Sequence, residues 1–175
     1  MILTDVWVPG LPKTKGSLTF RGNGYVEENV KGSARWRVLV AERVRADRRR
    51  RGLTSPSAGP VAVRALFWLP PAASPAPFET YAAVHTRSGD VDKLARNVLD
   101  ALGANAAVAA KNGGAYVDDV QVVDLRAVKM LAGGLVLPPG LALTVWELTP
   151  ALLAQDEGMY WMPERGRVER GVPTS

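Results

Sequence analysis

Apolar residues recur at helical spacing in two segments of the chain, residues 33–51 and 90–102. When successive residues are placed at 100° steps, each segment gathers its apolar side chains on one face, as an amphipathic helix does. Ser33 and Asp90 stand where these helices would begin, and both are residue types that cap helix N-termini. The apolar faces consist of Trp36, Leu39, Val40 and Val44 in the first segment and Leu94, Ala95, Val98, Ala101 and Leu102 in the second.

Four other segments, residues 2–8, 61–69, 117–130 and 141–148, are apolar, and most are rich in β-branched residues, so we predict strands there. The third is apolar on both faces at its centre, so we expect it in the interior of a sheet. We expect the fourth to pair with it across the glycine-containing turn region 133–140. The elements predict a compact α/β (α+β) single domain, with a mixed sheet of about four strands packed with two main helices.

Composition fits this prediction, because 175 residues that are 47% hydrophobic can form one domain with its own core. We place the domain at residues 1–150 and treat 151–175 as a C-terminal extension. The chain has no cysteine, which excludes disulfides, cysteine-based zinc sites and thiol catalysis, and one histidine, His85, cannot build a histidine metal site. We find no signal peptide and no apolar run of the ~18 residues that a membrane span needs, so we expect a cytoplasmic protein without membrane contact.

Charge is unevenly distributed along the chain. The net charge is +5, but residues 31–52 carry nine basic and two acidic side chains, an excess of +7. Four successive arginines exceed what a helix dipole needs and favour contact with a polyanion such as DNA. A second basic segment, residues 13–24, is glycine-rich; it is either a DNA-contacting loop or a solvated loop. The candidate DNA-binding residues are Lys13, Lys15, Arg21, Arg45, Arg48, Arg49, Arg50 and Arg51.

Six of the nine aspartates lie between residues 89 and 124. Asp90 and Asp92 stand at the start of a predicted helix, and Asp118 and Asp119 stand at the start of a predicted strand. Two acidic pairs on rigid elements suit a hard cation such as Mg²⁺, which binds carboxylate oxygens. Neighbouring strand residues point to opposite faces, so at most one of the second pair readily joins the first. The alternative is that these residues are helix caps, turn residues and surface ion pairs.

The segments GDVDKLARNVLDAL and VDDVQVVDLRAVKM resemble the RusA family of Holliday junction resolvases. The resemblance implies that Asp90, Asp92 and Asp119 bind Mg²⁺, with Mn²⁺ as a substitute, and that Asp118 orients water or supports a ligand. The family's essential lysine falls on Arg96, and its asparagine falls on Lys93. Arg96 keeps a cation for the phosphate, but it cannot act as an acid near neutral pH.

The resemblance also implies a homodimer that binds branched DNA, a four-way junction, and cuts it by symmetric paired nicks in DNA recombination and repair. The setting would be a bacterial cytoplasm, including that of a phage host. A metal nuclease acting on other branched DNA is one alternative. A non-catalytic junction-binding protein is another, and a catalytically decayed homologue, given the changes at Arg96 and Lys93, is a third.

Overall fold

The computed structural model describes residues 1–16, 18–20, 26–28, 30–71, 73, 89–104, 114–132 and 138–149. Its centre is a four-stranded sheet in the order β1-β6-β4-β5, which confirms the predicted mixed sheet with two main helices. Strand β4 pairs with β5 in parallel, whereas β6 pairs antiparallel with both β1 and β4. The strands are β1 (Ile2–Pro9), β4 (Val61–Leu69), β5 (Val122–Leu131) and β6 (Gly140–Glu147).

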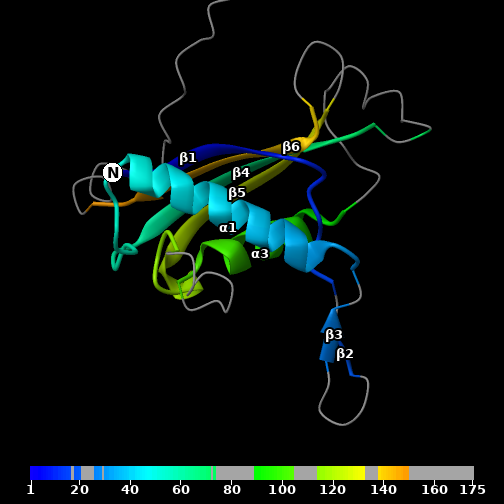
Figure 1. The fold of residues 1–175 in the computed structure, drawn as a ribbon, viewed down its shortest axis with the longest axis horizontal. Helices are drawn as coiled ribbons and strands as arrows, with labels where there is room; N and C mark the ends of the chain where they lie inside the picture. Colours follow the sequence, from blue (N-terminus) through cyan, green and yellow to red (C-terminus); the bar gives the residue numbers. More distant parts are fainter. Residues whose placement is uncertain are drawn as a thin grey trace, which may run out of the picture.

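Two short strands, β2 (Leu18–Phe20) and β3 (Val26–Glu28), form a separate antiparallel pair that projects from the body (Figure 1). Strand β2 lies in the segment, residues 13–24, where we predicted a basic loop, and β3 follows that segment. The predicted DNA-binding residue Arg21 and the predicted C-terminal extension both fall outside the described residues. Within the described part of the chain, no helix is long and apolar enough to cross a membrane.

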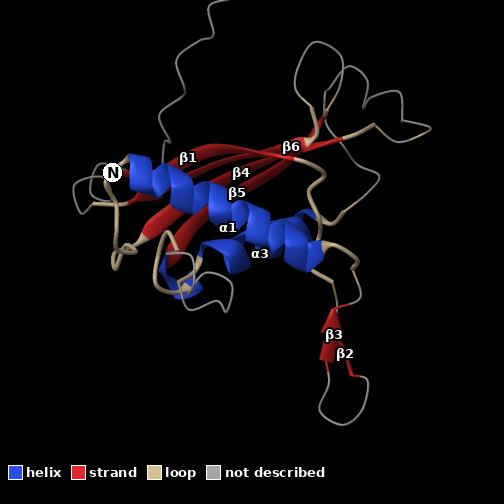
Figure 2. Ribbon diagram, viewed as in Figure 1, coloured by secondary structure: helices blue, strands red, loops and turns tan. Residues whose placement is uncertain are grey.

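Two helices, α1 (Ser33–Arg50) and α3 (Val91–Leu102), cover the same face of the sheet (Figure 2). Parallel strands need a long connection, and α3 lies in the segment that joins β4 to β5. The N-terminal end of α3 lies near the far end of β5, because Lys129 Nζ donates a hydrogen bond to the Gly89 carbonyl at 2.9 Å. Helix α3 therefore runs back along β5, from the end of that strand to its beginning.

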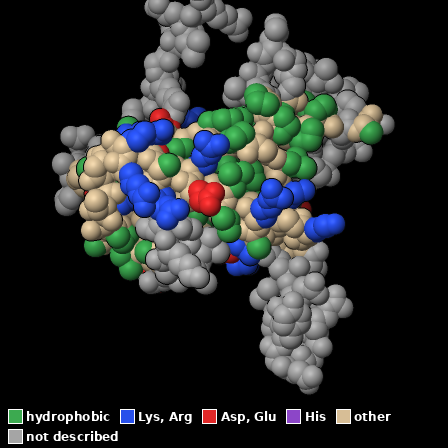
Figure 3. Space-filling view, in the orientation of Figure 1, with side chains coloured by type: hydrophobic (Ala, Val, Ile, Leu, Met, Phe, Trp, Pro, Cys, Tyr) green, Lys and Arg blue, Asp and Glu red, His purple; other side chains and the backbone are tan. Residues whose placement is uncertain are grey.

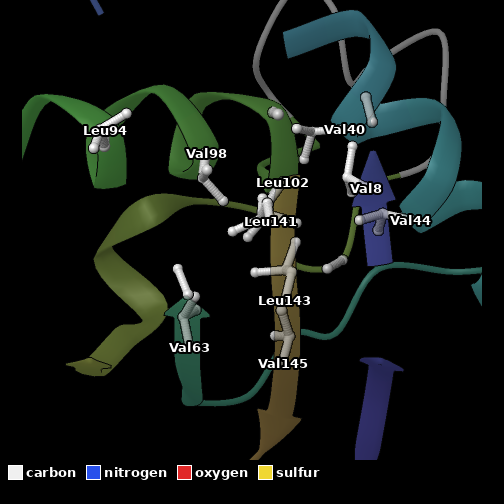
Figure 4. Close-up of a cluster of buried hydrophobic side chains, with 14 of the residues drawn as sticks. Val8, Val40, Val44, Val63, Leu94, Val98, Leu102, Leu141, Leu143 and Val145 are labelled. Atoms are coloured by element: carbon white, nitrogen blue, oxygen red, sulfur yellow. The ribbon is translucent and has the colours of Figure 1, made fainter. Parts of the chain in front are cut away.

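The core fills the space between the helices and the sheet. Side chains from α1, α3, β1, β4 and β6 meet there, and nearly all are inaccessible to solvent (Figure 4). They come from the positions that the helical and strand periodicities marked as apolar. Their burial supplies the main driving force for holding α3 rigidly on the sheet. The labelled members are Val8, Val40, Val44, Val63, Leu94, Val98, Leu102, Leu141, Leu143 and Val145.

Three of our predictions about the sheet and its strands are wrong. Strand β5 lies at an edge of the sheet, not in its interior, and β6 pairs with β1 and β4 instead of β5. A valine-rich sequence does not by itself indicate a central strand: no residue of β5 is fully buried, and Val123 is 54% exposed. In addition, residues 119–121 form a short 3₁₀ helix, η1 (Asp119–Gln121), before β5 begins. Asp118 and Asp119 are therefore loop and 3₁₀ residues, and the strand alternation that we applied to them does not hold.

The start of α1 also differs from the prediction. Gly32, with φ of 85°, occupies the N-cap position, and no side chain caps the helix. Ser33 is instead the first helical residue and is buried, with its hydroxyl donating to Asn97 Oδ1 at 3.3 Å. Asn97 is fully buried on α3 and donates to the Lys13 carbonyl at 2.6 Å. This polar contact ties α1, α3 and the segment after β1 together.

Candidate active site

The N-terminal end of α3 carries the first acidic pair. Asp90 is the N-cap residue, as predicted, but its carboxylate caps no backbone amide. It forms an ion pair with Lys93 Nζ at 2.7 Å, and that hydrogen bond, followed by the charge of Lys93, lowers the pKa of Asp90 below its usual value. Asp92 and Arg96 are exposed on the same helix. Both carboxylates of this pair thus face solvent near a cation.

The second acidic pair lies at the start of β5 and is held by Gln121. The side chain of Gln121 accepts from the backbone amides of Val117 and Asp118, both at 2.8 Å, and donates to the carbonyls of Ser57 and Gly59. The Asp118 side chain accepts from the Val120 amide at 3.2 Å, and its contact with the Gln121 backbone completes a capping box. We predict no role for Gln121 from the sequence, although its position three residues after an aspartate is the capping-box signature.

Asp119 is exposed as a residue, but its carboxylate lies against the C-terminal end of α3. Its Oδ1 is 3.3 Å from the position that a Cβ on Gly103 would occupy. Partial burial raises the pKa of Asp119; the Tyr116 hydroxyl opposes this shift, and the carboxylates of Asp100 and Asp118 add to it. The site accumulates negative charge, which a bound cation would stabilise. Burial also raises the pKa of Tyr116 well above its ordinary value, with the charge of Asp119 the next cause.

The two acidic pairs are at opposite ends of α3. Asp119 lies beside Gly103, which is thirteen residues after Asp90, so the helix separates them by about 20 Å at 1.5 Å per residue. A Mg²⁺ ion holds its ligands at about 2 Å, and paired metals are about 4 Å apart. Among the described residues of one protomer, no three acidic or histidine side chains are placed to hold a metal. One protomer therefore does not assemble the predicted triad.

A surface hollow of about 290 Å³ borders the N-terminal end of α3. Asp90 and Lys93 line it from the helix, and Lys15 lines it from the segment after β1. The Lys15 amide donates to the Lys93 carbonyl at 2.9 Å, and Lys15 Nζ pairs with Asp100 at 2.7 Å. Lys15 thus lies along α3, next to the acidic residues rather than on a distant loop.

The basic end of α1 divides into buried and exposed arginines. Arg48 is 3% exposed and donates to the carbonyls of Ser55 and Ala115 at 2.6 and 3.5 Å, so it is not available at the surface for DNA. Arg49 is exposed, and Arg50 and Arg51 are exposed but pair with Asp47. Figure 3 shows Lys and Arg side chains distributed over the α1 face of the molecule. The candidate DNA contacts of this helix reduce to Arg45, Arg49, Arg50 and Arg51.

An α/β domain that exposes carboxylates at both ends of one helix, with arginines and lysines on neighbouring elements, has the components of a nucleic-acid-cleaving enzyme. Comparison with family models identifies which family of nucleic-acid-cleaving enzymes the chain belongs to. Residues 9–136 match the model described as Endodeoxyribonuclease RusA, so the chain belongs to the RusA endodeoxyribonuclease family. A search of curated proteins finds no match.

Proposed function

We propose that this protein is a Mg²⁺-dependent, structure-selective endonuclease that resolves Holliday junctions by paired symmetric nicks. The family match supports DNA cleavage and junction resolution. The observation that carries the rest is the placement of Asp90, Asp92 and Asp119 on the surface, outside the hydrophobic core. Mn²⁺, which takes the same oxygen ligands, would substitute.

Bound Mg²⁺ would supply charge neutralisation and an activated water at the scissile phosphate. The carboxylates of Asp90, Asp92 and Asp119 would hold it, although one protomer by itself does not bring them together. Arg96 is exposed one turn along α3 from Asp92 and would neutralise phosphate charge with its planar guanidinium. Lys93 is held by Asp90, so its role would be to position that carboxylate until DNA or metal displaces the ion pair. Asp118 would act on Asp119 through the 3₁₀ turn that it caps.

Paired nicks on opposing strands need two sites, so the proposal includes a homodimer. DNA would contact basic side chains at the C-terminal end of α1 and in the segment after β1. These contacts would be to backbone phosphates and would select junction shape rather than base sequence. The residues are Lys13, Lys15, Arg45, Arg49, Arg50 and Arg51. The reaction would take place where the cell keeps its DNA, in a bacterial cytoplasm.

The proposal is tested by incubating a sequence-mobile four-way junction with wild-type protein and Asp92→Asn in Mg²⁺ and in Mn²⁺. The expected result is paired symmetric nicks from the wild type and their loss in Asp92→Asn, with junction binding retained. Glu42→Gln, an exposed acidic residue on α1, is the matched control and should cut normally. Tight junction binding by the wild type without nicking in either metal would overturn the proposal in favour of a non-catalytic binding protein. Nicking of flaps or forks in preference to junctions would indicate a nuclease for other branched DNA.

A further inference from the structure

The segment after β1 is attached to α3 through its backbone at two positions. The Lys13 carbonyl accepts from Asn97 Nδ2 at 2.6 Å, and the Lys15 amide donates to the Lys93 carbonyl at 2.9 Å. Asn97 is fully buried, and its Oδ1 also accepts from Arg37 Nη1 at 2.9 Å. Hydrogen bonds of a buried amide are costly to break, so this segment has a defined position on the helix.

The side chain of Lys15 ends among acidic residues near the C-terminal end of α3. Its ammonium pairs with the Asp100 carboxylate at 2.7 Å, and the two side chains are 30% and 24% exposed. Asp100 comes three residues before Gly103, beside which the Asp119 carboxylate lies. Burial raises the pKa of Asp119, and the charge of Lys15 is one of the influences that oppose this rise. Lys15 is therefore a cation next to one of the proposed metal ligands.

The ammonium of Lys15 has the capacity to bind a second anion. An ammonium carries three N–H donors, and the ion pair with Asp100 needs only one of them. A partly exposed ion pair contributes little to folding, so stability alone is a weak reason for this contact. The substrate of an endodeoxyribonuclease supplies phosphate oxygens, which form strong charge-assisted hydrogen bonds with an ammonium.

Lys15 is held differently from the other basic side chains near the acidic residues. Those at the C-terminal end of α1 belong to a helix that carries none of the proposed metal ligands. Lys93 lies on α3, but its ammonium pairs with Asp90, at the opposite end of the helix from Asp119. Lys15 is fixed to α3 through both its backbone and its side chain. A cation held in this way can orient a phosphate as well as attract it.

We propose that Lys15 binds a phosphate oxygen of the cleaved DNA strand beside Asp119, and that Asp100 is a positioning residue that holds the Lys15 ammonium there. This inference rests on the proposed function and deepens it, because it assigns one basic side chain to the site of cleavage. A DNA phosphate and the acidic residues of the site repel each other. The ammonium between them offsets that repulsion and fixes the position of the phosphate.

The phosphate contact is tested by nicking of a four-way junction in saturating Mg²⁺ and by junction binding without metal. Lys15→Met should lower kcat for nicking at least ~10-fold and should reduce the salt dependence of binding by about one counterion. Lys15→Arg keeps the charge and should restore the salt dependence and part of the nicking. Lys31→Met, at an exposed lysine just before α1, is the matched control and should leave both unchanged. Normal nicking or an unchanged salt dependence in Lys15→Met would overturn the proposal.

A double variant separates phosphate binding from simple neutralisation of Asp100. Asp100→Asn should lower kcat a few-fold and change junction binding little, because Lys15 keeps its charge but loses its fixed position. Lys15→Met combined with Asp100→Asn should be as defective as Lys15→Met alone, since Asp100 acts through Lys15. If Lys15 served only to neutralise Asp100, removal of both charges would restore nicking, and that result would overturn the proposal.

The binding measurements distinguish failure of this inference from failure of the proposed function. Wild-type protein that binds junctions but nicks none would contradict the proposed function. The salt dependences of wild type and Lys15→Met, measured without metal, would then still decide whether Lys15 contacts a phosphate. Thermal unfolding followed by circular dichroism shows for each variant that a loss of binding is not a loss of folding.

Discussion

Two groups of charged residues in this molecule look alike in sequence and differ in structure. The first is centred on Asp47 in α1, which is 4% exposed and accepts from Thr4 Oγ1 at 3.0 Å and the Asp5 amide at 2.9 Å. Arg50 and Arg51 complete its partners at 3.0 and 2.8 Å. The second consists of Asp90 and Asp92, which face solvent at the N-terminal end of α3, and Asp119, whose partly buried carboxylate lies at the C-terminal end. The carboxylate of the first group has all these hydrogen-bond partners within the protomer, whereas the second group is split between the two ends of α3.

The difference shows how charge is used in each region. A buried carboxylate must be hydrogen-bonded, because desolvation without partners costs several kcal/mol, and the Asp47 cluster meets that need while joining α1 to β1. An exposed ion pair such as Asp90 with Lys93 contributes little to stability. Carboxylates kept at the surface for little structural gain are therefore candidates for binding another molecule. Substitutions in the two groups should therefore change different properties of the protein.

The largest effect is expected for Asp119→Asn. Nicking of a four-way junction should fall at least ~100-fold, because a metal ligand is lost. The melting temperature at pH 7 should not fall. A raised folded-state pKa means that Asp119 favours folding below its unfolded pKa and loses that contribution as pH rises through the folded value. At pH 7 the ionised Asp119 side chain therefore disfavours folding, and a neutral amide removes this cost. A clear drop in the melting temperature together with normal nicking would contradict the assignment of Asp119 as a metal ligand.

Asp47→Asn should affect stability but not chemistry. Burial alone would raise the pKa of Asp47, but hydrogen bonds from Arg51, the Asp5 amide, Arg50 and Thr4 lower it from 3.8 to about 2. Such a shift corresponds to about 2 kcal/mol of folding free energy, present above pH ~4 and lost as pH falls toward 2. Urea unfolding from pH 7 down to pH 2 measures it, and Glu42→Gln is the control. A difference that does not shrink as pH falls would show that charge is not the cause.

Arg48 and Arg49 are adjacent in sequence and should behave differently. Arg48→Met removes buried hydrogen bonds to two carbonyls and should lower the free energy of unfolding by about 2 kcal/mol. Arg49→Met should change stability by less than ~0.5 kcal/mol, but should weaken junction binding and reduce its salt dependence by about one counterion. Binding isotherms across a salt series distinguish the two. Equal losses of binding per folded molecule would contradict the division between buried and exposed arginines.

The smallest effect is expected for Asp118→Ala, which removes the capping box of η1. The loss of this cap should cost about 1 kcal/mol and reduce nicking less than tenfold, because Gln121 still holds the loop. Asp118→Asn keeps a capping oxygen and should be closer to wild type in both measurements. A loss as large as that of Asp119→Asn would give Asp118 a direct role in metal or water binding.

Much of the fold could be predicted from local pattern. Helical periodicity located α1 and α3 to within a residue or two, because the side chains that recur at that spacing are the ones that fill the core. Sheet order could not be predicted, because a valine-rich segment such as β5 is equally compatible with an edge strand and with a central strand. The buried role of Arg48 was also hidden, because a run of arginines reads as surface charge until the Ser55 and Ala115 carbonyls are seen beside it.

The residues of the candidate site stay a prediction, and the structure adds their positions. Spacing and family resemblance picked out Asp90, Asp92 and Asp119, and the family match supports a nuclease. Distance in space depends on the direction of α3 between β4 and β5, and that direction puts the pairs at opposite ends. The separation became visible only when Asp119 was found beside Gly103.

The most direct test of the proposed metal site compares nicking of a four-way junction by wild type, Asp90→Asn, Asp119→Asn and Glu42→Gln across a Mg²⁺ titration. Junction binding by each protein is measured in parallel without metal. We expect wild type and Glu42→Gln to make paired nicks only when Mg²⁺ is present, and both aspartate variants to bind the junction without cutting it, because each loses a metal ligand. Normal nicking by either Asp90→Asn or Asp119→Asn would contradict a metal site that uses the acidic residues at both ends of α3.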